Sequence, residues 1–204
     1  MIEIETPHGL ARAHLQKVSS ARGALVLGHG AGGGVAARDL VTAAAAANTA
    51  GFSVALVEQP YRVAGRRSPA PAHHLDAAWV AIVEHLRAGE LSRLPLVAGG
   101  RSSGARVACR TAGVVGASAV LCLAFPLEPP SRGAPRPSRL PELDAVTVPT
   151  LVVQGRSDRF GMPPAARLRT VAQVTGDHSL RTDLVSIEAA VEGWLAEILV
   201  AFTS

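Results

Sequence analysis

Short apolar runs alternate with amphipathic segments along most of the chain. Six runs are expected to form buried strands, and they cover residues 23–27, 52–57, 95–98, 118–124, 149–154 and, as a weaker pattern, 171–174. The segments between them predict helices over 38–48, 72–88, 103–113 and 186–202, with a short one near 163–170. This alternation is typical of a mostly parallel sheet that is covered on both faces. The sequence therefore predicts an α/β fold.

The N-terminal stretch "MIEIETPHGLARAHLQKV" has a different pattern. Two strand-like runs flank a turn at residues 7–9, which predicts a hairpin that forms an antiparallel edge of the sheet. Neither an internal repeat nor a linker interrupts the rest of the chain. A length of 204 residues suits one domain, so a single domain over residues 1–204 is expected.

The composition is that of a globular protein, with 48% hydrophobic and 18% charged residues. No apolar run approaches the ~20 residues that cross a bilayer. The N-terminus lacks a basic start followed by a long apolar run, the pattern of a secretory signal. We therefore expect a cytoplasmic protein with no membrane partner.

The formal net charge of +4 comes almost entirely from arginine, since Lys17 is the only lysine. A basic chain can bind nucleic acid, but such proteins cluster their cationic residues on one face and often interleave aromatic residues. Here the arginines are scattered, and aromatic residues make up 3% of the chain. No nucleic-acid partner is expected.

Neither the cysteines nor the paired histidines form a metal-binding pattern. Cys109 and Cys122 lie in apolar surroundings and are expected to be buried structural residues. His73, His74 and His85 belong to one predicted helix that lacks a His-Glu-x-x-His motif. The sequence predicts no metal and no cofactor.

A serine between glycines lies where the strand at 95–98 ends and the next helix begins. Residues 100–104 read Gly-Arg-Ser-Ser-Gly, a Gly-x-Ser-x-Gly pattern. The spacing selects Ser102, because Ser103 would need glycines at 101 and 105, where the chain has arginine and alanine. The glycines are expected to adopt left-handed backbone geometry and to hold Ser102 in a strained turn. The alternative is a tight turn without a reactive serine.

A glycine-rich loop follows the strand at 23–27 and reads "HGAGGG" from His29. Small residues there leave backbone N–H groups free to face a developing oxyanion. The alternative is a phosphate-cradling loop, but no Lys-Ser/Thr follows as it does in a P-loop. We favour the oxyanion interpretation.

Asp158 and His178 come after later strands of the same predicted sheet. Because the carboxyl ends of parallel strands meet at one edge, both are expected close to Ser102. A serine hydroxyl needs a base, and the base needs a carboxylate that fixes its tautomer. Glu128 is the alternative acid, and Asp177 is interpreted as a residue that caps the loop.

The motifs "HGAGGG", "GGRSSGAR", "FPLEPP", "VVQGRSDRFG" and "DHSL" occur in this order along nearly the whole chain. In them the sequence resembles the α/β-hydrolase superfamily, in its small cap-less, dienelactone-hydrolase-like branch that includes KANL/Tex-type hydrolase-like proteins. The resemblance implies a three-layer α/β-hydrolase fold without a cap domain. It also implies Ser102 as nucleophile, Asp158 as acid and His178 as base, with the backbone N–H groups of Ala31 and Ser103 as the oxyanion hole. Dienelactone hydrolases proper have a cysteine at the nucleophile position, whereas this chain has Ser102.

The loop after the strand at 52–57 is expected to overhang the same edge of the sheet. Four side chains of this loop could line the substrate entrance, namely Tyr61, Arg62, Arg66 and Arg67. His29 and Arg101, from the loops after the strands at 23–27 and 95–98, could also contact the substrate. The arginines could attract a carboxylate or phosphate, or they could belong to a solvated loop. The proline-rich segment 125–148 is too short for a cap domain, which favours small or exposed acyl groups.

The function predicted is that of a serine hydrolase, which acts on a small ester, thioester or activated amide through an acyl-enzyme on Ser102. The alternative is a binding or scaffold protein of the same fold with little or no catalysis. The expected partner is a small acyl substrate, and the sequence leaves a homodimer open.

Overall fold

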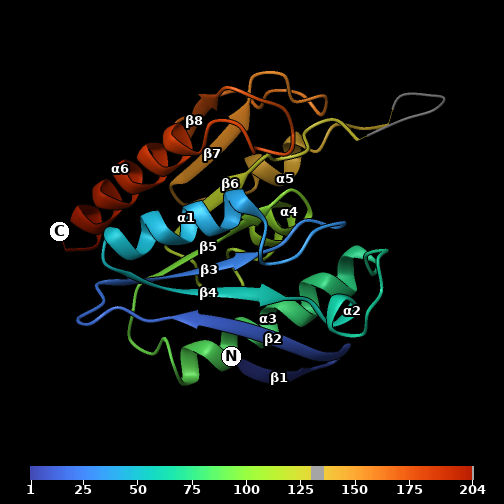
Figure 1. Ribbon diagram of the computed structural model, residues 1–204, viewed down its shortest axis with the longest axis vertical. Coiled ribbons are helices and arrows are strands. Elements are labelled where there is room, and N and C mark those ends of the chain that lie inside the picture. Colours follow the sequence, from blue (N-terminus) through green and yellow to red (C-terminus); the bar gives the residue numbers. More distant parts are fainter. Residues whose placement is uncertain (130–135, 204) are drawn as a thin grey trace.

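Eight strands form one sheet through the middle of the molecule (Figure 1). The computed structural model describes residues 1–129 and 136–203. The strands are β1 (Ile2–Thr6), β2 (Gly9–Gln16), β3 (Gly23–Gly28), β4 (Phe52–Glu58), β5 (Leu96–Arg101), β6 (Ala119–Leu123), β7 (Thr150–Gly155) and β8 (Arg169–Val174). Their order across the sheet is β1-β2-β4-β3-β5-β6-β7-β8.

The six strands from β4 to β8 in this order run parallel, and the N-terminal hairpin adds an antiparallel edge. β1 pairs with β2, and the turn between them needs Gly9, whose φ is 109°. The predicted mostly parallel sheet with an antiparallel N-terminal edge is thus confirmed. All parallel strands point their carboxyl ends toward one side of the molecule.

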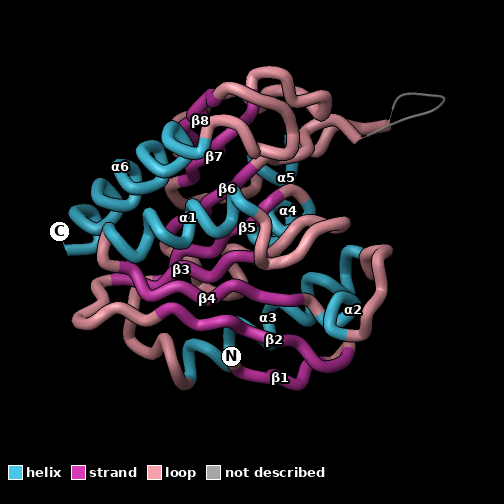
Figure 2. The backbone as a smooth tube through the Cα atoms, viewed as in Figure 1, coloured by secondary structure: helices cyan, strands magenta, loops and turns pink. Residues whose placement is uncertain are grey.

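Helices cover both faces of the sheet (Figure 2). They are α1 (Arg38–Thr49), α2 (Pro60–Val63), α3 (Ala72–Ala88), α4 (Ser103–Thr111), α5 (Leu140–Asp144) and α6 (Leu184–Thr203). Side chains alternate across the strands: Leu25 and Leu27 join the apolar cluster under α1 and α6, while Ala24 and Val26 join the cluster under α3 and α4. The result is three layers with two apolar cores.

The prediction of a short helix near 163–170 is wrong. Pro163 and Pro164 lack backbone N–H groups, and a proline disfavours helical geometry in the residue before it. The end of this segment leads into the sheet instead. Thr150 donates its N–H to the carbonyl of Leu168 at 2.7 Å, and β8 begins at Arg169.

Two short helices were not predicted, α2 and α5. Each begins with a proline in its first turn, a position where the missing N–H costs no hydrogen bond. The segment 125–148 was interpreted as a proline-rich loop without a cap. Its described residues contain α5, whereas residues 130–135 lie outside the part that the structure describes.

Arginine–carboxylate pairs hold α4, the helix that follows Ser102, against its neighbours. Arg110 donates two hydrogen bonds to Asp76 of α3, at 2.8 and 2.6 Å. Arg106 donates two more to Glu142 of α5, at 2.8 and 2.5 Å. Such two-point contacts fix orientation as well as distance, so α4 is a rigid support for the turn that precedes it.

None of the helices within residues 1–129 and 136–203 combines the length and the apolar composition of a membrane-crossing segment.

Candidate active site

Ser102 occupies the sharp turn between β5 and α4. Its backbone angles are φ 52° and ψ −108°, a strained combination for a residue with a side chain. The turn is held in place because the N–H of Ser102 donates to the carbonyl of Leu123 in the neighbouring strand β6, at 2.9 Å. This geometry lifts the Ser102 hydroxyl away from the sheet at the carboxyl end of β5.

The flanking glycines are required for space rather than for left-handed geometry. Neither Gly100 nor Gly104 has a positive φ, so that part of the prediction is wrong; the strain lies on Ser102 itself. A Cβ at Gly100 would lie 2.6 Å from the carbonyl oxygen of Gly28, and one at Gly104 would collide with the same oxygen. The glycines therefore let the turn pack directly on the end of β3.

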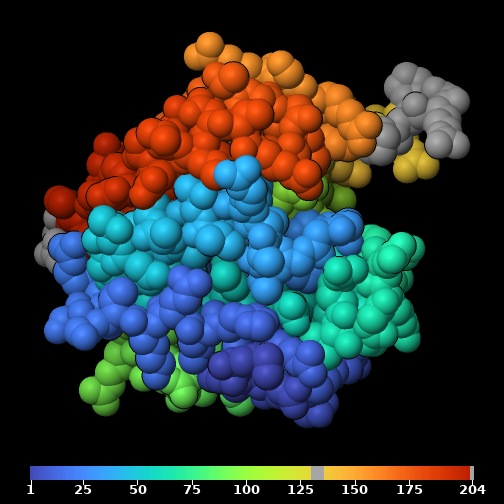
Figure 3. All heavy atoms as spheres, viewed as in Figure 1, coloured from blue at the N-terminus to red at the C-terminus, as the bar shows by residue number. Residues whose placement is uncertain are grey.

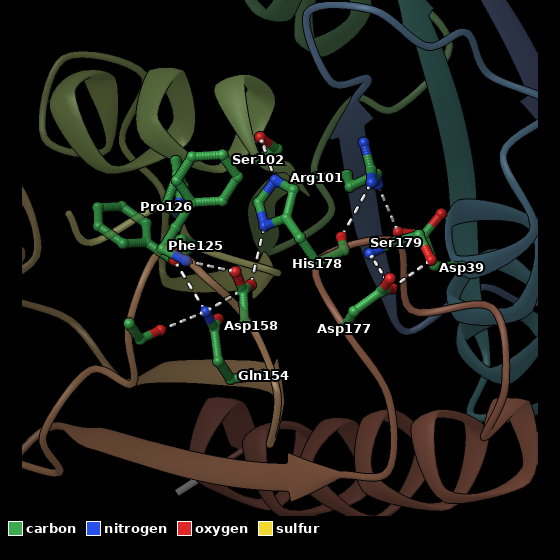
Figure 4. A network of polar contacts seen from close by, with 12 residues as sticks. Asp39, Arg101, Ser102, Phe125, Pro126, Gln154, Asp158, Asp177, His178 and Ser179 are labelled. Carbon is green, nitrogen blue, oxygen red and sulfur yellow. Dashed lines mark hydrogen bonds and ion pairs between the residues drawn. The ribbon is translucent and has the colours of Figure 1, made fainter. Parts of the chain in front are cut away.

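Ser102, His178 and Asp158 form a continuous chain of hydrogen bonds (Figure 4). The Oγ of Ser102 lies 3.0 Å from Nε2 of His178, and Nδ1 of His178 lies 2.8 Å from Oδ2 of Asp158. The three residues follow β5, β8 and β7, three strands of one half of the sheet. The contacts predicted between these side chains are both present.

The surroundings of Asp158 make it an acceptor on both oxygens. Gln154 donates to Oδ2 at 2.8 Å, and the N–H of Phe160 donates to Oδ1 at 2.9 Å. The carboxylate side chain is 1% exposed. Nδ1 of His178 is then the nitrogen that carries a proton toward Asp158, and Nε2 is left to accept the hydroxyl proton of Ser102. The ring of Phe160 lies edge-on against His178, with ring centroids 4.4 Å apart, and restrains its rotation.

The alternative acid is not in contact with the imidazole. Glu128 is exposed, and its backbone N–H donates to the carbonyl of Phe160 at 2.7 Å. Asp177, next to His178, accepts hydrogen bonds from the N–H and the hydroxyl of Ser179, at 2.8 and 2.5 Å. It caps the loop, as predicted.

The glycine-rich loop after β3 is fixed by His29. Nδ1 of His29 lies 2.9 Å from the carbonyl oxygen of Gly30, and its Nε2 accepts the N–H of Gln59 at 3.2 Å. Burial lowers the pKa of His29, which agrees with a neutral ring in these two contacts. The Gly30 carbonyl and the Ala31 N–H are opposite ends of one trans peptide, so the bond from His29 also sets the direction of that N–H.

Tyr61 lies beneath the same loop instead of at an entrance. It is 6% exposed, and its hydroxyl donates to the carbonyl oxygen of Ala31 at 3.0 Å. Burial raises the pKa of Tyr61 to about 12, so it remains a hydrogen-bond donor. The backbone N–H groups of Ala31 and Ser103, the two expected oxyanion donors, have no hydrogen-bond partner within the described residues.

Arg101 is occupied by contacts within the protein. Its Nε lies 2.9 Å from Oδ2 of Asp39, and its Nη2 donates to the carbonyl oxygen of His178 at 2.9 Å. Asp39 is 1% exposed, and burial raises its pKa while the charge of Arg101 opposes that rise. A Cβ at Gly30 would lie 2.7 Å from Nη1 of Arg101. Arg101 thus joins α1, the loop after β3 and the loop that carries His178.

The remaining arginines expected at an entrance lie on the loop after β4. Arg62 donates to the carbonyl of Arg66 at 3.3 Å, and Arg66 and Arg67 are exposed. Arg66 lines a cavity of about 340 Å³ together with Tyr61 and His8, and that cavity is not lined by Ser102, Asp158 or His178.

The buried thiols lie away from this hydrogen-bonded chain. Cys109 and Cys122 are buried with their sulfurs 3.5 Å apart. Their mutual contact and burial raise the pKa of Cys122. Within residues 1–129 and 136–203, no cluster of three histidine, cysteine or carboxylate side chains is arranged to hold a metal ion.

Two residues of the site, Asp39 and Gln154, were missed from the sequence. Gln154 stands four residues before Asp158 at the end of a fully buried strand, where a polar side chain is unusual, and that position was an available signal. Asp39 gave no such signal, since an acidic residue in the first turn of a helix is common on electrostatic grounds alone.

A family model described as an alpha/beta hydrolase domain matches residues 21–195. No curated protein sequence matches the chain. A serine hydrolase without a lid from Xanthomonas campestris is 16% identical, with a TM-score of 0.77 over 96% of this chain and 93% of its own.

Two further solved structures are similar over the whole fold. The esterase Est1E from Butyrivibrio proteoclasticus, with ferulic acid bound, is 15% identical, with a TM-score of 0.79 over 98% of this chain and 100% of its own. A dienelactone hydrolase from Anabaena variabilis is 15% identical, with a TM-score of 0.76 over 96% and 95%. At these identities the likeness concerns the fold.

Proposed function

The chain belongs to the alpha/beta hydrolase domain family, and from this premise we propose that it is a serine hydrolase that cleaves a small ester, thioester or activated amide. The eight-stranded, mostly parallel sheet with helices on both faces is the fold of that family. One observation carries the proposal: Ser102, in a strained turn, is hydrogen-bonded to His178, which is hydrogen-bonded to Asp158.

In the proposed first step, Oγ of Ser102 forms a bond to the acyl carbon while its proton moves to Nε2 of His178. The carbonyl π electrons move onto the oxygen, which becomes an oxyanion. That oxyanion would accept hydrogen bonds from the N–H groups of Ala31 and Ser103, which are unused within the described residues. Asp158 stabilises the imidazolium through Nδ1.

Collapse of this intermediate breaks the bond to the leaving group, which takes the proton from Nε2 of His178. An acyl-enzyme on Ser102 remains. Water then gives a proton to His178 as its oxygen attacks the acyl carbon, and the second collapse returns that proton to Ser102 and releases the acid. One water is consumed and every protein group is regenerated, so the site is ready for another turnover.

The accessibility of the site favours small or exposed acyl groups. Residues 136–148 follow the undescribed residues of segment 125–148. They contain the short helix α5, which packs on α4. The similar serine hydrolase from Xanthomonas campestris is described as having no lid, and Est1E binds ferulic acid. Short aliphatic esters and hydroxycinnamate esters are therefore the first substrates to try.

The test is covalent labelling with a fluorophosphonate probe, combined with hydrolysis of short 4-nitrophenyl esters and acyl thioesters. The wild type should be labelled and should hydrolyse at least one of them, and Ser102→Ala should lose both properties. Cys109→Ala is the matched control: it removes a buried nucleophile on α4 and should keep labelling and turnover per folded molecule.

Two results would contradict the proposal. Labelling of Ser102→Ala at the wild-type rate would place the nucleophile elsewhere. A folded wild type that is neither labelled nor active on any ester or thioester would favour the alternative, a binding or scaffold protein of this fold.

A further inference from the structure

A pocket of about 410 Å³ is lined by sequence neighbours of the candidate active-site residues. Its lining residues are Gly32, Gly33, Ala36, Ala37, Arg38, Asp39, Arg101, Ser179 and Arg181. Three of them are sequence neighbours of site residues: Gly32 follows Ala31, Arg101 precedes Ser102, and Ser179 follows His178. A substrate whose acyl carbon lies at Ser102 could therefore extend into this pocket.

We propose that this pocket binds an anionic group of the substrate, a carboxylate or a phosphate, through Arg38 and Arg181. The inference rests on the proposed hydrolase function and adds a substrate class to it. It differs from the expectation drawn from the sequence, which assigned such a role to the arginines of the loop after β4.

The balance of charge in the pocket favours an anion. Asp39 is the acidic member of the lining, and its carboxylate is already paired with Arg101 at 2.9 Å. Arg38 and Arg181 form no ion pair within the described residues. The lining therefore holds three arginines and one carboxylate, an excess of positive charge that concentrates anions.

The carboxylate of Asp177, which precedes a lining residue by two positions, is directed elsewhere. Asp177 precedes the pocket wall in sequence, but its Oδ1 accepts both hydrogen bonds from Ser179 and it does not line the pocket. Ser179 is itself a lining residue, so its loop is ordered by this contact (Figure 4).

The two arginines come from segments that are far apart in the sequence but adjacent in space. Arg38 begins α1, and Arg181 lies in the loop between β8 and α6. In Figure 3 the blue surface around the start of α1 abuts the orange-red surface of the segment that leads into α6. A planar guanidinium from each side can donate two hydrogen bonds to one carboxylate or phosphate. Gly32 leaves the pocket open, since a Cβ there would meet no atom within 4 Å.

The kinetic experiment compares two esters of equal length, the mono-4-nitrophenyl ester of glutaric acid and 4-nitrophenyl valerate. The readout is the ratio of their kcat/KM values. Wild type should favour the anionic ester by about fivefold or more at low salt, since exposed ion pairs contribute modestly. The preference should fall at high salt, because salt screens exposed charges.

Arg38→Gln and Arg181→Gln should each lower this ratio, and the double variant should bring it close to one. Arg66→Gln is the matched control: it removes an exposed arginine that lines a different cavity, and it should keep the wild-type ratio. A wild-type ratio near one, or a ratio unchanged in the double variant, would overturn the inference.

A second measurement separates this inference from the proposed hydrolase function. Ser102→Ala is titrated calorimetrically with glutarate and with inorganic phosphate, with and without the two arginine substitutions. Binding that is lost with Arg38→Gln and Arg181→Gln supports the pocket even if the wild type hydrolyses neither ester, and the tighter anion identifies carboxylate or phosphate as the group bound. Absence of binding, or binding that ignores both substitutions, overturns it even if the enzyme is active.

Discussion

Arg101, the residue before Ser102, donates from Nη2 to the backbone carbonyl of His178 at 2.9 Å. Its Nε is paired with the buried carboxylate of Asp39 at the same distance. The residue next to Ser102 thus holds the loop that carries His178, and a carboxylate from α1 holds that arginine in turn. The hydrogen bond between Ser102 and His178 depends on the relative position of two loops that this side chain joins.

Arg101→Lys should lower kcat by about tenfold, with a smaller change in KM, because an ammonium group cannot reproduce a planar fork that reaches two acceptors. The control is Arg169→Lys. Arg169 is buried and likewise has two acceptors, the Pro164 carbonyl and Asp144, but it lies at the start of β8, at the opposite end of the strands from Ser102. Steady-state kinetics and thermal unfolding of both variants check this. Equal loss of kcat in the two variants would show that Arg101 acts through general stability alone.

Ser102→Gly should be more stable to urea than Ser102→Ala by about 1 kcal/mol, although both lack the proposed nucleophile. Glycine adopts φ 52° and ψ −108° without a steric cost, whereas alanine keeps the strain. At Ser186, in the first turn of α6, the order should be reversed, because glycine is the poorer residue within a helix. Equal stability of the two Ser102 variants would mean that the turn relaxes when the hydroxyl is removed.

Asp158→Asn should reduce kcat by about 10⁴-fold, because an amide favours the wrong tautomer of His178. Gln154→Met should have a smaller effect, about tenfold, since it removes one donor to Asp158 and leaves the carboxylate in place. Glu128→Gln tests the alternative acid and should retain wild-type kinetics. A severe loss in Glu128→Gln together with an active Asp158→Asn would reverse the assignment.

The unfolding free energy should fall as the pH drops below about 6.5, in part because of His29. Its pKa is lowered in the folded protein from 6.5, so the unfolded chain binds the proton first, and acid favours unfolding. The stability difference between wild type and His29→Gln should therefore be largest above pH 6.5 and shrink toward pH 5. Asp39, with its raised pKa, acts in the opposite sense but is common to both proteins. Urea titrations at pH 7.5, 6.5 and 5.5 measure this, and a constant difference would contradict it.

The parallel strands β3 to β7 could be predicted because nearly every residue in them is buried and most are apolar, so their pattern does not depend on the neighbours that cover them. β5 is longer than its apolar run, since Gly99, Gly100 and Arg101 continue the pairing with β6. Glycines do not extend an apolar run in the sequence. They are needed here because neighbouring strands approach too closely for a Cβ. The segment before β8 was misread because its alanine and arginine residues favour a helix locally, while Pro163, Pro164 and the hydrogen bond from Thr150 to Leu168 oppose one.

The residues of the candidate site also differ in how well they could be predicted from the sequence. Ser102, Asp158 and His178 could be proposed because each follows a strand, and the sheet gathers strand ends at one edge. The roles of Arg101 and Tyr61 could not, because both depend on hydrogen bonds to backbone carbonyls of distant loops, which leave no pattern in the sequence. Position next to a catalytic motif suggested contact with substrate, whereas the observed contacts are with the protein.

The three residues of the hydrogen-bonded chain follow strands that differ in stability. Ser102 follows β5 in the centre of the sheet, but His178 follows β8, which is paired with β7 alone and has exposed residues along its length. Edge strands open more readily than central ones, without unfolding of the whole molecule. The proposed hydrolysis then depends on the pairing of β8 with β7 at this edge of the sheet. On warming, hydrolytic activity should be lost before the rest of the sheet unfolds. On cooling, activity should return at the rate at which β8 pairs with β7 again.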